Sequence, residues 1–338
     1  MEERVNEFLQ GMVNRAKERP ARVCFPESES VDILACAARV VELGMGVPVL
    51  VGNREKVESL ASESGIQATG FEYFDNGDEA CREELANAYD ALGAGEYSHK
   101  AILRKSKDPV NCGMIMLRCG MVDCVAAGKE RSTGDVVFSA MSFVGLADGV
   151  ESPSSLGIAD IPGFEGPQGS MLGLADCAIT AQPDAADLAG IAISSADTAR
   201  TLLGWEPRVA LLAFSTKGSA EHESIDVVRA AVERVHELRP DILCDGELQL
   251  DAAIIPAAAK HKVKGESPVA GRANILIFPN LHAGNIGVKM VQIFGHANAY
   301  GPVLQGFAKP VCDFSRSAPV DEMLGNVAML IIRAGGDL

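Results

Sequence analysis

Short apolar runs alternate with segments of helical periodicity along most of this 338-residue chain. The clearest runs, at residues 22–26, 47–51, 208–214 and 273–278, are rich in Val, Ile, Leu and Phe. Between them, segments such as 225–238 carry apolar residues at the spacing of one helix face. This alternation predicts βαβ units, in which buried parallel strands lie between layers of helices. We therefore expect an α/β protein built from doubly wound parallel sheets.

The segment GLADGVESPSSLG at residues 145–157 lies near the middle of this pattern and reads as a crossover between two βαβ-rich blocks. The C-terminal residues are expected to return to the first block. This predicts a first domain of residues 1–145 plus 300–338 and a second domain of residues 146–299. Because ligand sites form preferentially between domains, we expect the active site in the cleft between the two.

The net charge, the lengths of the apolar runs and the cysteine spacing argue against several classes of protein. The chain has 30 basic and 46 acidic residues, and a net charge of −16 argues against nucleic acid as a partner. No apolar run is long enough to span a membrane, and the charged N-terminal segment lacks the apolar core of a signal peptide. The nine cysteines are scattered without metal-ligand spacing. We therefore expect a cytoplasmic protein with reduced thiols, no metal site and no membrane contact.

Polar loops follow several of the strand-like runs, and each contains hydroxyl groups, glycine or a cation. Because ligands bind beyond the carboxyl ends of parallel strands, these loops are the candidate binding segments. None contains a P-loop or a GxGxxG fingerprint, so a nucleotide-hydrolysing or NAD-dependent function is poorly supported. The loops are residues 128–133, 215–219, 280–289 and 315–316.

The stretch from Pro279 to Arg316 carries the strongest indication of an anionic substrate. We expect Gly284, Asn285 and Gly287 to form a turn before a helix that carries Lys289, so that backbone N–H groups face an anion. A later strand-like run ends in Ser315-Arg316, a hydroxyl beside a planar cation. Plainer interpretations stay open, because 215–219 could be only a helix entry, Lys289 only a solvated cation, and 315–316 only a surface turn.

Long blocks of the second half closely resemble the phosphate acetyltransferase (phosphotransacetylase) family, in its short single-module type. The N-terminal part matches more loosely, through RVCFPES and the Ser132–Asp135 element. The blocks are LADCAITAQPDAADLAGIA at 174–192, EPRVALLAFSTKGS at 206–219, DGELQLDAA at 245–253, GRANILIFPNLHAGNIGVKMVQ at 271–292 and GPVLQGFAKPVCDFSR at 301–316.

The resemblance implies reversible acetyl transfer between acetyl phosphate and coenzyme A, in a homodimer of two-domain subunits. Coenzyme A and acetyl-CoA would be substrates, and no cofactor would be bound permanently. In the family a carboxylate takes the thiol proton, the thiolate attacks the acyl carbonyl, and a serine and an arginine stabilise the transition state. Ser315 and Arg316 match that serine and arginine. A thiol with an ordinary pKa needs such a base at neutral pH, and the developing oxyanion needs donors.

The chain departs from the family pattern around the site. The catalytic aspartate that usually follows the serine by seven residues is Glu322 here, with Asp321 beside it, and either acid could be the base. The usual SRGCS becomes SRSAP at 315–319. Two arginines that bind coenzyme A or phosphate are missing, one within Ala91–Gly95 and one at Phe138. Lys129, Arg131 and Arg104 are the candidate replacements.

The resemblance leaves three functions to separate. The leading one is an active phosphate acetyltransferase, which the LQG and DGELQ blocks favour over the related phosphate butyryltransferase. A third is a degenerate homologue that binds coenzyme A without turnover. The residues expected to bind substrate are Arg131, Ser132, Thr133, Ser215, Thr216, Gly218, Ser219, Asn285, Lys289 and Gln305.

Overall fold

The computed structural model describes residues 2–93, 95–148 and 150–335, and its chain divides into two compact units. The first unit comprises Met1–Ala147 and Phe307–Leu338, and the second comprises Asp148–Gly306. The domain limits expected from the sequence, 145/146 and 299/300, stay predictions beside these units. Parts of three expected features lie outside the described residues: Ala94 in the arginine-free stretch, Gly149 in the crossover, and 336–338 in the first domain.

The first unit contains a fully parallel sheet in the order β3-β2-β1-β4-β11. Its strands are short and mostly buried, as expected for strands covered on both faces. The chain proceeds from β1 to β2 and β3 on one side, and β4 pairs with the other side of β1. The carboxyl ends of β1 and β4 therefore mark a topological switch point, where such sheets bind ligands. The strands are β1 (Ala21–Phe25), β2 (Gly46–Val51), β3 (Glu72–Phe74), β4 (Cys124–Ala127) and β11 (Val311–Asp313).

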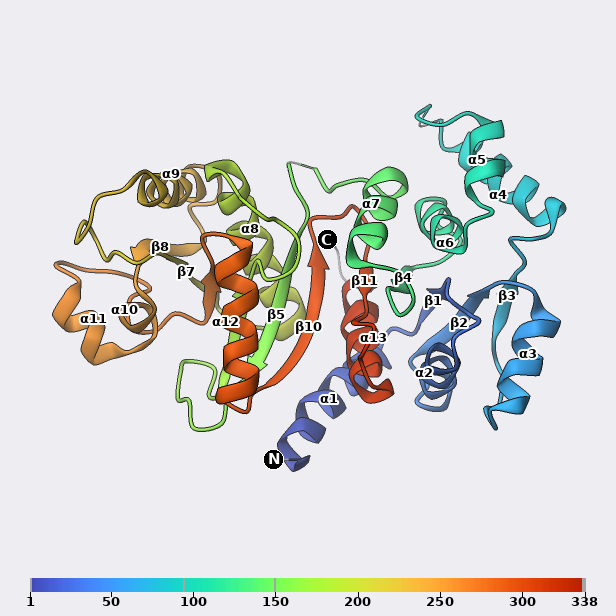
Figure 1. The fold of residues 1–338 in the computed structure, drawn as a ribbon, viewed down its shortest axis with the longest axis horizontal. Helices are drawn as coiled ribbons and strands as arrows, with labels where there is room; N and C mark the ends of the chain where they lie inside the picture. Colours follow the sequence, from blue (N-terminus) through green and yellow to red (C-terminus); the bar gives the residue numbers. More distant parts are fainter. Residues whose placement is uncertain (1, 94, 149, 336–338) are drawn as a thin grey trace. The chain divides into compact units, whose positions relative to one another are not determined.

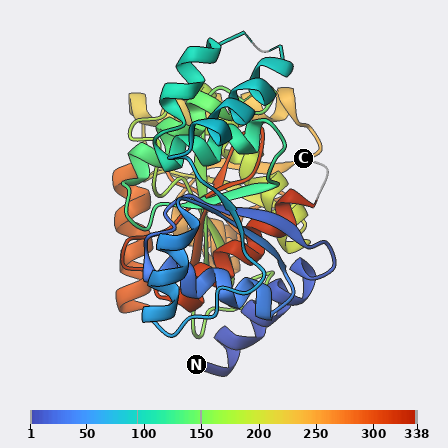
Figure 2. The same cartoon turned by 90° about the vertical axis from the view of Figure 1, so that its right-hand side faces the viewer.

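Helices cover both faces of this sheet. In Figure 1, α6 and α7 lie above the strands of this unit, and α2 and α13 lie below them, with α1 against α13. Figure 2 shows the same two layers from the side, the blue helices below and the teal helices above. The helices are α1 (Glu2–Ala16), α2 (Val31–Glu42), α3 (Arg54–Glu63), α4 (Glu79–Ala91), α5 (His99–Lys105), α6 (Pro109–Arg118), α7 (Thr133–Phe143) and α13 (Val320–Ala334).

Several helices of this unit begin at residues whose side chains cap the helix N-terminus. The side chains of Asn53, Asp78 and Asp108 each accept a hydrogen bond from a backbone N–H in the first turn of the following helix. At α7, the Ser132 hydroxyl accepts from the Asp135 N–H while the Asp135 carboxylate accepts from the Ser132 N–H. A Ser-Thr pair followed by an acid, as at 132–135, predicts a helix start, and this capping box confirms it.

The second unit contains a mixed sheet in the order β10-β5-β6-β9-β7-β8. β5 runs antiparallel to β10 and β6, and the other pairs are parallel. The prediction of an α/β fold with mainly parallel strands is confirmed, but β5 is an exception that begins inside the expected crossover. Its link to β6 is too short for a helical crossover, so the two strands pair antiparallel. The strands are β5 (Ser154–Asp160), β6 (Met171–Ala175), β7 (Arg208–Leu212), β8 (Leu243–Leu248), β9 (Ile275–Ile277) and β10 (Asn298–Gln305).

Two apolar clusters hold helices on the faces of this sheet. α8 and α9 bury Leu188, Ile191 and Val228 against one face, whereas α10 and α12 place Ala252 and Val291 against the other (Figure 1). The sequence pattern predicts one helix over residues 251–260, which is wrong. The chain turns at Ile255, and a new helix starts at Pro256, which lacks an N–H. The helices are α8 (Ala185–Thr198), the π-helical turn η1 (Ala199–Leu203), α9 (Glu223–Leu238), α10 (Leu250–Ile254), α11 (Pro256–Lys262) and α12 (Leu281–Phe294).

Helix α12 begins earlier than the sequence predicted. It starts at Leu281 with Asn280 as its N-cap, so the expected glycine turn at 284–287 is wrong and these residues are helical. Gly284 is needed for close packing, because a Cβ there would lie 2.2 Å from the backbone oxygen of Asp176. The small residues of this segment therefore bring a helix onto the 176–177 backbone instead of forming an anion-binding turn.

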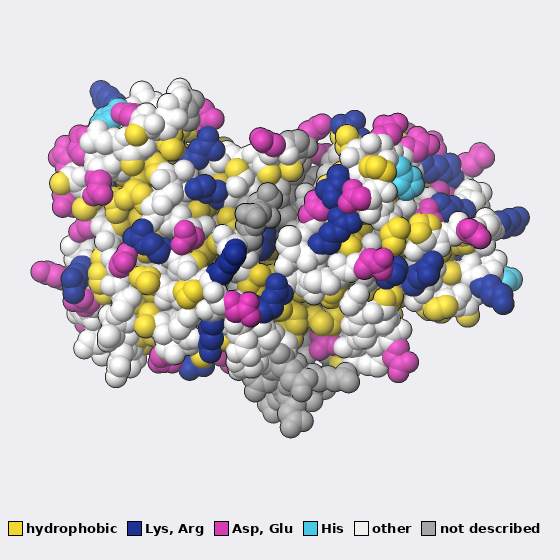
Figure 3. Space-filling view, turned by 180° about the vertical axis from the view of Figure 1, so that it is seen from behind, with side chains coloured by type: hydrophobic (Ala, Val, Ile, Leu, Met, Phe, Trp, Pro, Cys, Tyr) yellow, Lys and Arg dark blue, Asp and Glu magenta, His cyan; other side chains and the backbone are white. Residues whose placement is uncertain are grey.

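The surface carries charges of both signs (Figure 3), and the cysteines are free. On the face in Figure 3, basic and acidic side chains are mixed with one another. Among the described helices, none has both the length and the apolar character needed to cross a membrane. All nine cysteines are free, and those other than Cys81 and Cys119 are buried.

Candidate active site

The first unit brings two of the predicted loops together. β4 and β11 are parallel neighbours, so residues 128–133 and 314–319 leave the sheet at the same edge. The Thr133 hydroxyl at the start of α7 donates a hydrogen bond of 2.6 Å to Oδ2 of Asp313, the last residue of β11. Thr133 is thereby tied to the strand that delivers Ser315 and Arg316.

Ser315 and Arg316 form an exposed turn at the end of β11. The Ala318 N–H donates to the Ser315 carbonyl oxygen over 2.9 Å, and the Ser315 and Ser317 hydroxyls lie 3.1 Å apart. Both the hydroxyl and the guanidinium therefore face solvent, next to a buried floor that includes Phe314 and Ala318. Both donors are therefore accessible to an anionic substrate.

Of the two acids that follow the turn, Glu322 has the more protected environment. It lies half-buried in the first turn of α13, whereas Asp321 is exposed. Burial raises the pKa of Glu322, and the nearby positive charge of Lys129 partly opposes that rise. A carboxylate with a raised pKa is better matched to proton abstraction near neutral pH. The structure thus favours Glu322 over Asp321 as the candidate base.

Asp313 is a buried carboxyl group directly beneath the turn. Its side chain is 3% exposed, and its Oδ1 lacks a hydrogen-bond partner among the described residues. Burial raises its pKa to about 7, further raised by Glu27 and opposed by the Thr133 hydrogen bond and by Arg316. Gly128 leaves room for this group, since a Cβ there would lie 2.0 Å from Oδ1.

Replacing this carboxyl should change how stability depends on pH. The folded chain keeps the proton on Asp313 to about pH 7, and the unfolded chain releases it near the ordinary value of 3.8. The ionised group therefore costs stability as pH rises. Relative to wild type, the unfolding free energy of Asp313→Asn should rise by about 3 kcal/mol between about pH 5 and about pH 8. Urea unfolding at both pH values measures this, and a pH-independent difference would contradict the assignment.

The backbone donors of the 128–133 loop are already occupied. Glu27, which follows β1, accepts hydrogen bonds from the N–H groups of Lys129, Glu130 and Arg131, at 2.9, 3.0 and 2.8 Å. Glu27 is 7% exposed, so an internal carboxylate fills the place at the switch point where a ligand anion would lie. The loop is therefore held rigid by the protein's own anion.

The side chains of this loop also have internal partners. Arg131 pairs with Asp108 at 2.6 Å, and the Ser132 hydroxyl is bonded within its capping box. Neither group points to a free anion site in the described residues, and their role in binding substrate stays a prediction. Of the candidate replacements for the missing arginines, Arg104 is exposed on α5 and Lys129 is buried. Phe138, where the resemblance implies an arginine, is 73% exposed on α7.

In the second unit, the 215–219 loop surrounds another internal carboxylate. Glu247 is 2% exposed and accepts hydrogen bonds from the Ser215 hydroxyl, the Gly218 N–H and the Arg229 guanidinium. Ser219 accepts from the Thr216 N–H, and the Thr216 hydroxyl bonds Gln249. The sequence predicts a strand over residues 242–245, but β8 extends to Leu248 and so includes Glu247. The polar groups of the loop thus stabilise the loop itself, and substrate binding there stays a prediction.

Neutralising Glu247 should destabilise the second unit near neutral pH. Burial alone would raise its pKa, but the bonds from Arg229, Gly218 and Ser215 overcome this and lower the pKa to about 2. The stabilisation is present above the ordinary value of 4.5 and is lost as pH falls toward about 2. Because Arg229 is partly solvated, we expect Glu247→Gln to lower the unfolding free energy by about 2 kcal/mol at neutral pH.

Thermal or urea unfolding of Glu247→Gln against pH measures this loss, with Glu237→Gln, an exposed acid on α9, as control. An equal loss at neutral and strongly acidic pH would show that packing, and not the charge of Glu247, is responsible.

The remaining predicted binding residues lie at separate places in the second unit. Gln305, at the end of β10, is 1% exposed, accepts from Thr198 and donates to the Ser154 and Ser195 hydroxyls. Asn285 and Lys289 are exposed on α12, where Asn285 donates to the Cys177 carbonyl oxygen over 3.3 Å. Gln305 thus forms a buried structural network, and for all three residues contact with substrate stays a prediction.

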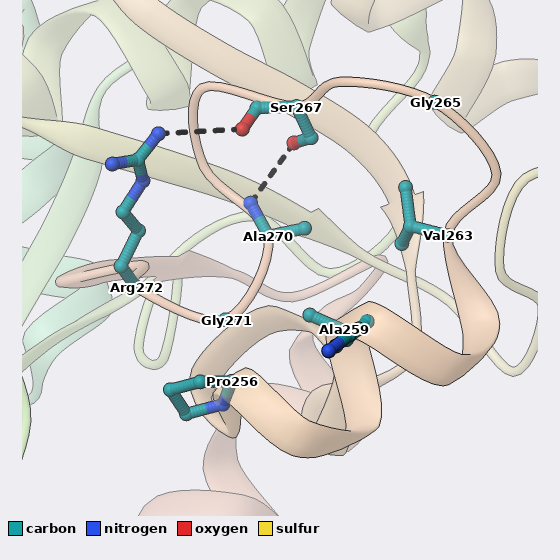
Figure 4. A pocket seen from close by; sticks show the side chains of 9 residues that line it. Pro256, Ala259, Val263, Gly265, Ser267, Ala270, Gly271 and Arg272 are labelled. Atoms are coloured by element: carbon teal, nitrogen blue, oxygen red, sulfur yellow. Dashed lines mark hydrogen bonds between the residues drawn. The ribbon is translucent and has the colours of Figure 1, made fainter.

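A cavity of about 340 Å³ in the second unit is lined by none of the residues predicted to bind substrate. It is lined by α11 and the loop that follows it, including Pro256, Ser267 and Arg272 (Figure 4). The Ser267 hydroxyl accepts from the Val269 and Ala270 N–H groups and donates to Asp245, so its bonding capacity is used. Within the described residues, His, Cys, Asp and Glu form no group of three that could hold a metal ion.

The carboxylates Glu27, Asp313 and Glu247 were not singled out from the sequence as site-forming residues. Each lies at or just beyond the carboxyl end of a strand, next to a loop that was singled out for its donors. An acidic residue at the carboxyl end of a strand could indicate such an internal acceptor from the sequence. Buried N–H donors of a loop need an acceptor, and a carboxylate of the same chain can provide it.

The family model described as "Phosphate acetyl/butaryl transferase" matches residues 7–331. The chain belongs to this family. A phosphate acetyltransferase from Thermoanaerobacterium thermosaccharolyticum is 39% identical to it over 97% of this chain and 99% of the relative. These findings confirm the resemblance seen in the sequence and the expectation of an acyltransferase.

Solved structures of relatives share the fold. A phosphotransacetylase from Streptococcus pyogenes has a TM-score of 0.90 and 30% identity, covering 97% of this chain and 98% of its own. The EutD phosphotransacetylase from Staphylococcus aureus has a TM-score of 0.87 and 29% identity, covering 96% and 99%. This chain and these two structures thus correspond over nearly their full lengths.

Proposed function

We propose that this chain is a phosphate acetyltransferase that catalyses acetyl-CoA + phosphate = CoA + acetyl phosphate. The observation that carries the proposal is the exposed Ser315-Arg316 turn beside the half-buried Glu322, in a member of this family. The relative at 39% identity is named for this activity. Coenzyme A, acetyl-CoA, acetyl phosphate and phosphate are substrates in this proposal, and it requires no permanently bound cofactor.

The chemistry is direct transfer in a ternary complex. The Glu322 carboxylate accepts the thiol proton of coenzyme A, and the thiolate sulfur forms a bond to the carbonyl carbon of acetyl phosphate. The carbon–oxygen bond to phosphate then breaks, and phosphate leaves with that electron pair. Arg316 and the Ser315 hydroxyl donate to the oxygen atoms that gain negative charge. Asp321 is too exposed to match this role as well as Glu322.

The test is consumption of acetyl phosphate that depends on coenzyme A, with thioester formation followed by absorbance. Turnover with acetyl phosphate and much slower turnover with butyryl phosphate supports the proposal. The names of the relatives do not favour the butyryl enzyme. Binding of coenzyme A without turnover of either acyl phosphate would instead identify the degenerate homologue.

We further propose that the protein works in the cytoplasm as a homodimer. The free and mostly buried cysteines suit a reducing compartment. An exposed apolar row on α12, formed by Ile286, Met290, Ile293 and Phe294, is compatible with a subunit contact. Light scattering of the purified chain should give twice the mass of one chain, and a monomer at working concentration would rule the dimer out.

A further inference from the structure

Lys129 is a buried lysine at the centre of the first unit's candidate site. It follows β4 at the switch point of the sheet and is 9% exposed. Its Nζ donates 2.9 Å to the carbonyl oxygen of Ala318 and lies 2.8 Å from Oδ2 of Asp32, at the start of α2. A lysine this buried is rare unless it is paired, and here both partners fix its position.

The contact with Ala318 places Lys129 under the Ser315–Pro319 turn. Ala318 closes that turn through its own N–H, and its carbonyl oxygen is the group that Lys129 holds. The next residue, Pro319, is the N-cap of α13 and provides no side-chain cap. Lys129 thus supplies a side-chain anchor at the point where the turn passes into the helix that carries Glu322.

We propose that Lys129 is a positioning residue for the reaction, which anchors the Ser315-Arg316 turn and holds a positive charge beside Glu322. The inference rests on the proposed function. Lys129 is also one of the candidate replacements for the missing arginines. In this proposal it positions the catalytic groups, because it is too buried to bind coenzyme A directly.

The charge environment of Glu322 sets the sign of the effect. The charge that lowers the pKa of Glu322 belongs to Lys129, in the loop after β4. Asp32 on α2 pairs with Lys129, and Glu322 in turn raises the pKa of the Cys312 thiol on β11, which stays neutral. Burial raises the pKa of Glu322, and Lys129 lowers it. Removing Lys129 should therefore raise this pKa further and reduce the fraction of ionised base near neutral pH. Removing Asp32 should have the opposite effect, because the charge of Lys129 is then less compensated.

The experiment is the pH profile of kcat/KM for wild type, Lys129→Met, Asp32→Asn and Lys107→Met, an exposed lysine that serves as control. We expect the acidic limb to move up by about one pH unit in Lys129→Met and down in Asp32→Asn. It should stay in place in Lys107→Met. A merely structural role would lower activity at all pH values without these opposite shifts.

A direct titration separates this inference from the proposed function. The carboxyl carbon resonance of Glu322, assigned by its loss in Glu322→Gln, is followed against pH in the same variants. If wild type lacks turnover, the proposed function fails, and the titration still decides the role of Lys129. An unchanged Glu322 midpoint in Lys129→Met overturns the inference. If that variant does not fold, Asp32→Asn decides, and a midpoint that stays or rises overturns it.

Discussion

Glu322→Gln should lower kcat by roughly 10²–10⁴-fold, which is the contribution typical of general-base catalysis. The amide keeps the size and polarity of the side chain but cannot accept the thiol proton. Because Glu322 is only half-buried and has Lys129 nearby, the substitution should leave the fold intact. Initial rates of thioester formation at saturating coenzyme A and acetyl phosphate measure the loss.

Asp321→Asn is the matched control for this prediction, since the two acids are neighbours in the first turn of α13. Its exposed side chain should matter little, and we expect kcat within about threefold of wild type. The reverse pattern, with a large loss in Asp321→Asn and a small one in Glu322→Gln, would transfer the role of base to Asp321. Equal large losses would point to the charge of the helix start, which both acids share.

Arg316→Ala should lower kcat by about 10²–10³-fold, the cost of removing one preorganised donor from a developing oxyanion. The guanidinium is exposed at the end of β11, so its removal leaves no cavity in the core and should not unfold the chain. The effect should appear mainly in kcat, because a donor aimed at the transition state contributes little to ground-state binding. Steady-state kinetics that resolve kcat from each KM measure this.

Arg316→Lys and Arg272→Ala complete the test. Lysine retains the charge without the planar fork of donors, so Arg316→Lys should recover only part of the activity. Arg272 is an equally exposed arginine in the second unit, and its removal should leave kcat unchanged. A rise in KM at unchanged kcat in Arg316→Ala would assign Arg316 to substrate binding and not to the transition state.

Much of the fold was predictable from local patterns. The apolar runs at 22–26, 47–51 and 208–214 became β1, β2 and β7, and the cap at Ser132 became the start of α7. Such features depend on residues close in the chain. β5 was missed because its direction depends on pairing with β6 and β10, which the residues of the strand do not encode. The start of α12 was misplaced because glycines read as a turn where they serve helix packing.

The candidate site, like the fold, contains features that the sequence predicts and contacts that it does not. The sequence predicts a role for the Ser315-Arg316 pair, and the family resemblance adds the acids at 321 and 322 without deciding which of them is the base. The donor-rich loops at 128–133 and 215–219 were also found, but the sequence could not show that Glu27 and Glu247 occupy their donors. Each of these hydrogen bonds joins residues far apart in the chain. The local sequence therefore shows the donor groups but not the carboxylate that accepts from them.

The sequence by itself determined the alternation of strands and helices, because this depends on residue type and local spacing. Its resemblance to a known family identified the family and the catalytic candidates. Tertiary structure alone decided which polar groups remain available. It buried Asp313 and Lys129 beneath the turn, filled two loops with internal carboxylates, and left Ser315 and Arg316 exposed. The reason is physical: a buried polar group must find a partner, and only the folded chain brings distant partners within hydrogen-bond distance.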